Sequence, residues 1–263
     1  MCRAEPSSRS SSPATSSATG SCARLWSASR RAARRPTAAS RRVPTTHLPP
    51  PSVNLLGPLS AETVGVAVFA LSGALVAARK GMDPFGFALL AAVTGVGGGT
   101  LRDLLLGTRP VFWVGDPSDV IVCLVVAGVI FCLGPRRVGI FDGGKRGRAL
   151  LWADALGLAL FAVIGTGKAL AAGVPAISAI ALGTVTATFG GIIRDMLAGT
   201  TPLVLRQEIY VTAAALGAGV MVGLQAFRLD PVTCGVAGFA AAFALRALAL
   251  LRGWSLPAFP RRD

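Results

Sequence analysis

Long apolar stretches, each about the length of a membrane-spanning helix, make up most of the chain from residue 58 onward. They cover residues 58–78, 84–106, 118–134, 150–171, 175–198, 208–227 and 231–251. A helix needs about 20 mostly apolar residues to cross the ~30 Å hydrocarbon core of a bilayer. Of the 263 residues, 52% are hydrophobic and 14% are charged, which is not the composition of a soluble domain. The sequence therefore predicts an all-α membrane protein with seven transmembrane helices, of which the third is the shortest and the seventh carries Arg246.

The first six stretches contain two copies of one unit. A shift of 92 residues, without a gap, aligns residues 61–112 with 153–204 and makes 19 of the 52 positions identical. An Arg-Asp dipeptide occurs in both copies at the same distance from a pair of glycines. Shared Ala and Gly enrichment would give scattered matches but not this alignment, so the chain contains an internal duplication.

Each copy holds three predicted spans, and an odd number of crossings makes the second copy enter the membrane from the opposite side. We therefore expect two inverted three-helix repeats, at residues 58–134 and 150–227, followed by a seventh transmembrane helix at 231–252. Substrate and permeation sites of such proteins tend to lie near the bilayer midplane, where the two repeats meet.

The net charge of +14 arises from basic residues that are unevenly placed. Nine arginines lie in residues 1–50, a stretch with too few large apolar side chains to form a core. We expect this Arg/Ser/Pro-rich tail to be disordered, and it has no apolar segment of the length that a secretory signal needs. Most of the other basic residues flank the apolar stretches, as in loops beside a membrane, so we expect no binding of nucleic acid.

Two groups of basic residues predict the orientation. The connection between the third and fourth spans, at residues 136–148, contains five basic residues, and the C-terminal end contains three more. With seven spans, both groups lie on one side of the membrane, and an excess of Lys and Arg marks the cytoplasmic side. We therefore expect a multi-pass protein of the cell (plasma or inner) membrane, with its N-terminus outside and its C-terminus in the cytoplasm.

Residues suited to catalysis or metal binding are scarce. The five cysteines show no C-x-x-C spacing, and the only histidine, His47, lies in the tail. The chain also lacks sequence patterns of a nucleophile with its base or of a zinc site. We expect no enzyme activity, no metal and no cofactor.

Glycines are grouped at equivalent places in the two repeats, as Gly97, Gly98 and Gly99 in the second span and Gly190 and Gly191 in the fifth. A glycine inside a helix costs about 1 kcal/mol relative to alanine and allows the backbone to bend or unwind. We expect a break in each span. Because broken backbone survives in a membrane only when buried in protein or lining a wet cavity, the break predicts a binding or conduction role. The alternative is close helix packing through small residues.

Four charged residues follow these glycines, namely Arg102 and Asp103 in the first repeat and Arg194 and Asp195 in the second. Each costs on the order of 3 kcal/mol at the bilayer centre unless it is paired or hydrated. Neighbours on a helix point about 100° apart, so we expect pairing across the repeats, Arg102 with Asp195 and Arg194 with Asp103. Such pairs either belong to the transport path or only hold the repeats together.

Three more charged residues lie in the apolar stretches. Glu62 and Asp154 are equivalent and lie near the starts of the first and fourth spans, where the helix dipole favours an acid, so we expect capping. Lys168 has the apolar Val76 as its equivalent, and its long stem allows the ammonium to reach the lipid interface. The alternative for Lys168 is gating, because a full charge gains about 2.3 kcal/mol per 100 mV of membrane potential.

Four segments resemble the bacterial family that was once listed as uncharacterised and is now known by a glycine-transporter domain name. They are residues 69–74 (FALSGA), 79–83 (RKGMD), 97–103 (GGGTLRD) and 154–158 (DALGL). That family is similar to the trimeric intracellular cation (TRIC) channels. The resemblance, over about residues 58–252, implies a homotrimer with a separate pore in each subunit, between glycine-kinked second and fifth helices, for potassium and other monovalent cations. It includes one departure, Phe189 in place of the first repeat's Gly97.

The expected function is therefore a monovalent cation channel with itself, membrane lipids and cations as partners. The alternative is a secondary transporter for glycine or another small solute. A channel needs a continuous wet path, whereas a transporter needs an occluded site coupled to an ion, and glycine-rich spans suit both. A structural membrane protein without transport is a third possibility.

Overall fold

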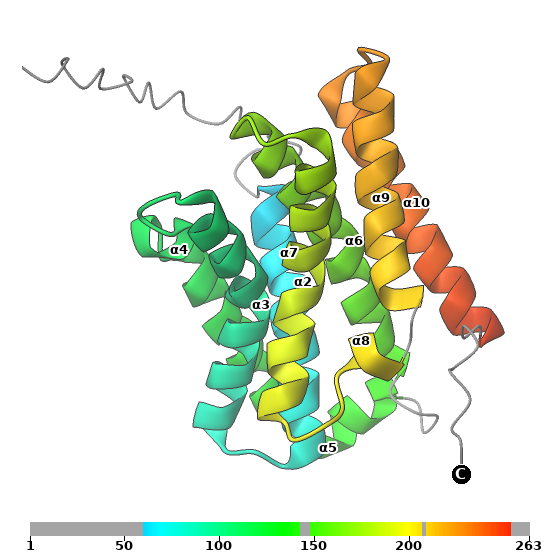
Figure 1. Ribbon diagram of the computed structural model, residues 1–263. Helices are drawn as coiled ribbons and strands as arrows, with labels where there is room; N and C mark the ends of the chain where they lie inside the picture. The colour runs from blue at the N-terminus through cyan, green and yellow to red at the C-terminus, as the bar shows by residue number, and fades with distance from the viewer. Residues whose placement is uncertain (1–59, 143–147, 207–208, 254–263) are drawn as a thin grey trace, which may run out of the picture. The chain divides into compact units, whose positions relative to one another are not determined.

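The computed structural model describes residues 60–142, 148–206 and 209–253, and within them all regular secondary structure is helical (Figure 1). The helices are α2 (Ala61–Lys80), α3 (Pro84–Leu106), α4 (Phe112–Gly115), α5 (Ser118–Asp142), α6 (Arg148–Ala171), α7 (Ala176–Leu197), α8 (Leu203–Arg206), α9 (Ile209–Ala226) and α10 (Pro231–Arg252). The expected tail at residues 1–50 lies outside the described residues.

Six of the long helices are apolar and long enough to cross a membrane, namely α2, α3, α6, α7, α9 and α10. The predicted all-helical membrane protein is thereby confirmed. The third predicted span is the exception, because the apolar part of α5, Ser118–Gly134, is shorter than the others. At ~1.5 Å per residue it extends roughly 26 Å. Gly134 then leaves the helical conformation, with φ 70° and ψ 167°.

The ends of the long helices follow the sequence closely. Ser60 caps α2, because its Oγ accepts a hydrogen bond from the Thr63 backbone N–H at 3.1 Å. Asp83 caps α3 in the same way, and Pro84 occupies the first helical position, where its missing N–H costs least. Gly81 ends α2 with φ 61°, a left-handed conformation that favours glycine.

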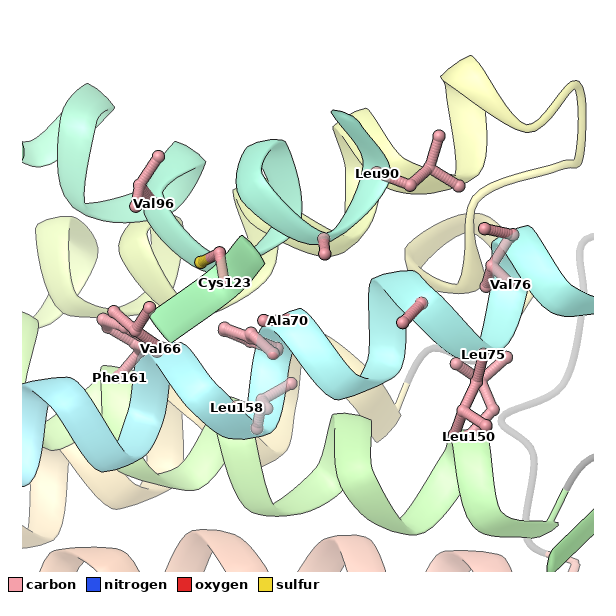
Figure 2. Close-up of a cluster of buried hydrophobic side chains, with 14 of the residues drawn as sticks. Val66, Ala70, Leu75, Val76, Leu90, Val96, Cys123, Leu150, Leu158 and Phe161 are labelled. Atoms are coloured by element: carbon pink, nitrogen blue, oxygen red, sulfur yellow. The ribbon is translucent and has the colours of Figure 1, made fainter. Parts of the chain in front are cut away.

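The helix α2 lies at the centre of the core and packs against α3, α5 and α6. In Figure 2, Leu75 of α2 points toward Leu150 of α6, and Val66 lies near Phe161. The rings of Phe69 and Phe161, 92 residues apart, stack with centroids 5.2 Å apart. The Phe69 ring rests on a glycine at position 157, since a Cβ there would approach Phe69 Cδ1 to 2.6 Å. A Cβ at Gly65 would likewise lie 3.0 Å from the Phe161 ring, so the same kind of contact joins the two copies from both sides.

Consecutive long helices run in alternating directions, so α2 and α6 point opposite ways although they begin the two copies of the repeat (Figure 1). The second helices of the copies, α3 and α7, also pack against each other. Their crossing brings both glycine groups into the protein interior.

Candidate functional site

The glycine groups form the crossing of α3 and α7. A Cβ at Gly98 would lie 2.1 Å from the backbone oxygen of Thr186, and a Cβ at Gly190 would lie 2.5 Å from that of Thr94. Thr94 and Thr186 are themselves 92 residues apart, so the two contacts are equivalent. The crossing thus brings the backbone of each helix against the backbone of the other.

The predicted break in the second and fifth spans is wrong. Both α3 and α7 are helical throughout, including Gly97, Gly98, Gly99, Gly190 and Gly191. The close crossing agrees with this, since an unbroken helix satisfies its own backbone hydrogen bonds while Gly98 and Gly190 allow the two backbones to approach. Packing through small residues, the alternative in the sequence, accounts for Gly98 and Gly190 in this structure.

A first charged cluster, Glu62, Arg102, Asp103 and Lys168, lies where α3 and α6 end and α2 begins. Arg102 donates from Nε to Asp103 Oδ1 at 2.9 Å and from Nη2 to Glu62 Oε1 at 3.2 Å. Lys168 Nζ donates to the other oxygen of Glu62. The Arg102 side chain is fully buried, whereas that of Lys168 is 32% exposed.

A second charged cluster, Ser72, Asp154, Arg194 and Asp195, repeats this arrangement. Arg194 donates from Nε to Asp195 Oδ1 at 2.8 Å and from Nη1 to Asp154 Oδ1 at 2.7 Å. Nη1 also donates to Ser72 Oγ of α2. The side chains of Arg194 and Asp154 are fully buried. In each cluster the arginine thus pairs with the next residue and with an acid 40 positions earlier.

The two clusters lie near opposite ends of α6. That helix contributes Asp154 to the second cluster and Lys168 to the first. The two residues are 14 positions apart, about 21 Å along a helix. The α3–α7 crossing therefore has a buried arginine and its acids near each end.

The predicted pairing of Arg102 with Asp195 and of Arg194 with Asp103 is wrong. Each arginine pairs with the acid that follows it in sequence. Although neighbours on a helix diverge at Cβ, the arginine stem is long enough to fold Nε back to the adjacent carboxylate. One further nitrogen of each guanidinium, Nη2 of Arg102 and Nη1 of Arg194, then reaches an acid on the first helix of the same repeat, a partner that the expected pairing omitted.

The expected capping role of Glu62 and Asp154 also needs correction. Glu62 does lie in the first turn of α2, but both of its oxygens accept from cationic side chains. Asp154 is the seventh residue of α6, beyond the first turn, and accepts from Arg194. Ser60 rather than Glu62 caps α2, and another acid contacts the start of a different helix, because Asp103 Oδ2 accepts from the N–H of Phe112, the first residue of α4, at 2.9 Å.

Asp195 makes the same contact in the second repeat, where its Oδ2 accepts from the Leu203 N–H at the start of α8, at 2.9 Å. Each Arg-Asp dipeptide thus pairs its own charges and also anchors a short helix that covers the end of the bundle.

Two residues of this region are not apparent from the repeat. Tyr210, near the start of α9, is 1% exposed, and its hydroxyl oxygen would lie 2.9 Å from a Cβ at Gly191. Arg246 of α10 is also 1% exposed, with its guanidinium carbon 5.1 Å from the centre of the Tyr210 ring. Arginine is rare inside a span unless it has a function, which is the signal in the sequence that could have identified Arg246.

Comparison with known proteins agrees with this architecture. A family model described as "Glycine transporter" matches residues 59–135 and 151–226. The UPF0126 inner membrane protein YadS of Escherichia coli K12 is 40% identical over 201 residues, which cover 75% of this chain and 94% of YadS. A UPF0126 membrane protein of Vibrio cholerae is 40% identical over 203 residues, covering 75% of this chain and 81% of that protein.

Solved structures share the fold. The TRIC trimeric intracellular cation channel orthologue of Rhodobacter sphaeroides superposes with a TM-score of 0.69 at 52% identity, over 74% of this chain and 97% of that one. A second structure, described in a study of conductance through TRIC cation channels, gives a TM-score of 0.69 at 32% identity, over 77% and 97%. The chain is therefore a multi-pass membrane protein that belongs to the glycine-transporter family and has the fold of the TRIC channels.

Proposed function

We propose that this protein is a monovalent cation channel of the TRIC type, conducting potassium, with a path in each subunit along the crossing of α3 and α7. The observation that carries the proposal is the 52% identity to a TRIC channel orthologue over 97% of that chain. The crossing supports the location, because both glycine groups and both Arg-Asp dipeptides lie on these two helices.

The proposal includes seven spans arranged as two inverted repeats and a last helix, with α5 as the third span despite its shorter apolar part. Two observations support inversion. Contacts of residues 92 positions apart are equivalent, as for Thr94 and Thr186, and the helices that begin the repeats run in opposite directions (Figure 1). The basic segment at 136–148 supports a cytoplasmic C-terminus.

We interpret the close packing at Gly98 and Gly190 as the closed state of the path. Ions can pass only when α3 and α7 separate at this point, and glycine allows such movement because no side chain interlocks there. Lys168 is suited to control it, since its partly exposed ammonium pairs with Glu62 of the other repeat. A change of membrane potential that pulls Lys168 away would release a carboxylate that attracts cations.

Planar bilayers containing the purified protein test the proposal. We expect unitary current steps under a potassium gradient, with a reversal potential that follows the potassium equilibrium potential. A protein that gives no unitary currents in bilayers, but whose proteoliposomes accumulate radiolabelled glycine, would instead be a transporter, the activity for which the family model is named. If the protein gives neither currents nor uptake, a structural role remains.

A further inference from the structure

The last glycine of each group, Gly99 and Gly191, lies against an aromatic side chain. A Cβ at Gly99 would lie 2.7 Å from Phe112 Cε1, and a Cβ at Gly191 would lie 2.9 Å from the Tyr210 hydroxyl oxygen. The two aromatic residues are not related by the repeat, because the 92-residue shift places Val204, not Tyr210, opposite Phe112. Duplication therefore does not explain why each end of the crossing has such a contact.

The Phe112 ring is held by the short helix α4, which two hydrogen bonds tie to the last turns of α3. The Phe112 N–H donates to Asp103 Oδ2 at 2.9 Å, and Trp113 Nε1 donates to Thr100 Oγ1 at 2.9 Å. These bonds hold α4 against α3, and neither of them involves the Phe112 ring.

The same ring lies close to both cations of the first charged cluster. Its centre is 5.7 Å from Arg102 Cζ and 5.7 Å from Lys168 Nζ. Arg102 belongs to α3 and Lys168 to α6, so the ring bridges these helices at the end of the bundle. At this distance each cation is attracted to the face of the ring.

We propose that Phe112 is the constriction that closes the cation path at the end marked by the first charged cluster, a proposal that rests on the proposed function. An apolar ring seated on Gly99 fills the space beside α3 that a side chain would otherwise occupy. A hydrated cation cannot enter such a space, and hydrophobic constrictions close channels by excluding water. Rotation of the ring away from Gly99 would open this end without unfolding α3 or α4.

The test measures access of a water-soluble reagent to a cysteine at the α3–α7 crossing, deeper along α3 than the glycine that the ring contacts. Gly97 suits the cysteine, because a Cβ there would contact only the end of the Ile193 side chain at 3.4 Å and the Gly190 Cα at 3.9 Å. In an otherwise cysteine-free full-length protein, the rate at which a cationic methanethiosulfonate modifies Gly97→Cys is followed by mass spectrometry in detergent.

We expect Phe112→Ala to raise this rate about tenfold or more, because a dewetted constriction becomes hydrated. Phe85→Ala, which removes an 83% exposed ring at the other end of α3, is the matched control and should leave the rate unchanged. Gly99→Ala should also raise the rate, since its Cβ displaces the ring. It should have no further effect in the Phe112→Ala background.

An unchanged rate in folded Phe112→Ala, or full additivity of the two substitutions, would overturn the proposal. If Phe112→Ala fails to fold, Gly99→Ala alone decides, and an unchanged rate in that variant is the contrary result. The rate of cysteine modification reports the access of water and does not depend on ion flux. Failure of the constriction is therefore distinguishable from failure of the channel, which shows as absence of unitary currents in the parent.

Discussion

Arg102 and Arg194 are each held by two acids, the residue that follows in sequence and an acid on the first helix of the same repeat. Arg102, Asp103, Arg194 and Asp195 stand out because charges are costly inside apolar stretches. Which acid each arginine reaches depends on how α2 crosses α3 and how α6 crosses α7, and no pattern in the sequence encodes these crossings. The duplication did contain a usable signal, since Glu62 and Asp154 each precede their arginine by 40 residues.

The pairing can be measured with double-mutant cycles. We expect strong coupling between Asp154→Asn and Arg194→Gln, because removing either partner alone leaves a fully buried charge, at a cost of about 3 kcal/mol or more in the free energy of unfolding. The measurement is the melting temperature in detergent of both single variants and the double variant. The matched cycle of Asp103→Asn with Arg194→Gln, which crosses the repeats, should be additive. Coupling there instead would mean that the repeats exchange partners.

Among the helices, the sequence predicted the long elements to within a few residues at most ends, because apolar length is a local signal, whereas the caps at Ser60 and Gly81 emerged only from the structure. The sequence did not predict that the glycine groups remain helical. Local propensity favours a break at Gly98, whereas the tertiary contact with Thr186 requires a helix without a side chain at that point. Only the relative position of α3 and α7 decides between these outcomes.

Alanine substitutions separate packing glycines from the rest. Gly98→Ala should lower the free energy of unfolding by several kcal/mol, because its Cβ would lie 2.1 Å from a backbone oxygen that can move only with α7. Gly97→Ala should cost much less, since its Cβ meets a side-chain end at 3.4 Å. Gly128→Ala on α5, with no atom of another element within 4 Å, is the control and should stabilise by roughly 0.5–1 kcal/mol. Equal melting temperatures for Gly97→Ala and Gly98→Ala would contradict the crossing.

In the molecule as a unit, the duplication was the most informative feature of the sequence, because equivalent positions of the two copies make equivalent contacts, as Gly98 with Thr186 and Gly190 with Thr94. Departures from the repeat show where the two ends differ. Lys168 replaces the first repeat's Val76 and adds a cation to the first cluster, whereas the second cluster uses Ser72 instead. The added helix α10 brings Arg246 to Tyr210, for which the repeat has no counterpart. Sequence comparison of the halves finds such differences but not the contacts that they make.

We expect the protein to form a homotrimer in mild detergent. Phe85, Ile177 and Phe227 are each about 80% exposed, so large apolar side chains remain for contact with lipid or with other subunits. Native mass spectrometry measures the assembly directly. The variant Gly98→Ala is a useful comparison, since damage to the core of one subunit should reduce the trimer and monomer yields together. Monomers or dimers alone, across several detergents, would contradict the expected trimer.

The inverted topology makes opposite predictions for the two ends of the bundle. Gly115 of α4 and Lys80 of α2 are both exposed, and they lie at the two ends of α3 because Lys80 precedes its start and Gly115 follows its end. If the basic segment at 136–148 is cytoplasmic, α5 places Gly115 outside and α2 places Lys80 inside.

In a cysteine-free background, an impermeant maleimide applied to intact cells should therefore label Gly115→Cys and spare Lys80→Cys until the membrane is opened by detergent. Because α4 covers the end that contains Lys168 and Phe112, the same result would place that end of the proposed path on the outer side. Labelling of Lys80→Cys alone would reverse the orientation and preserve the inversion. Labelling of both sites in intact cells would show that α3 does not cross the membrane, and the seven-span arrangement would then be wrong.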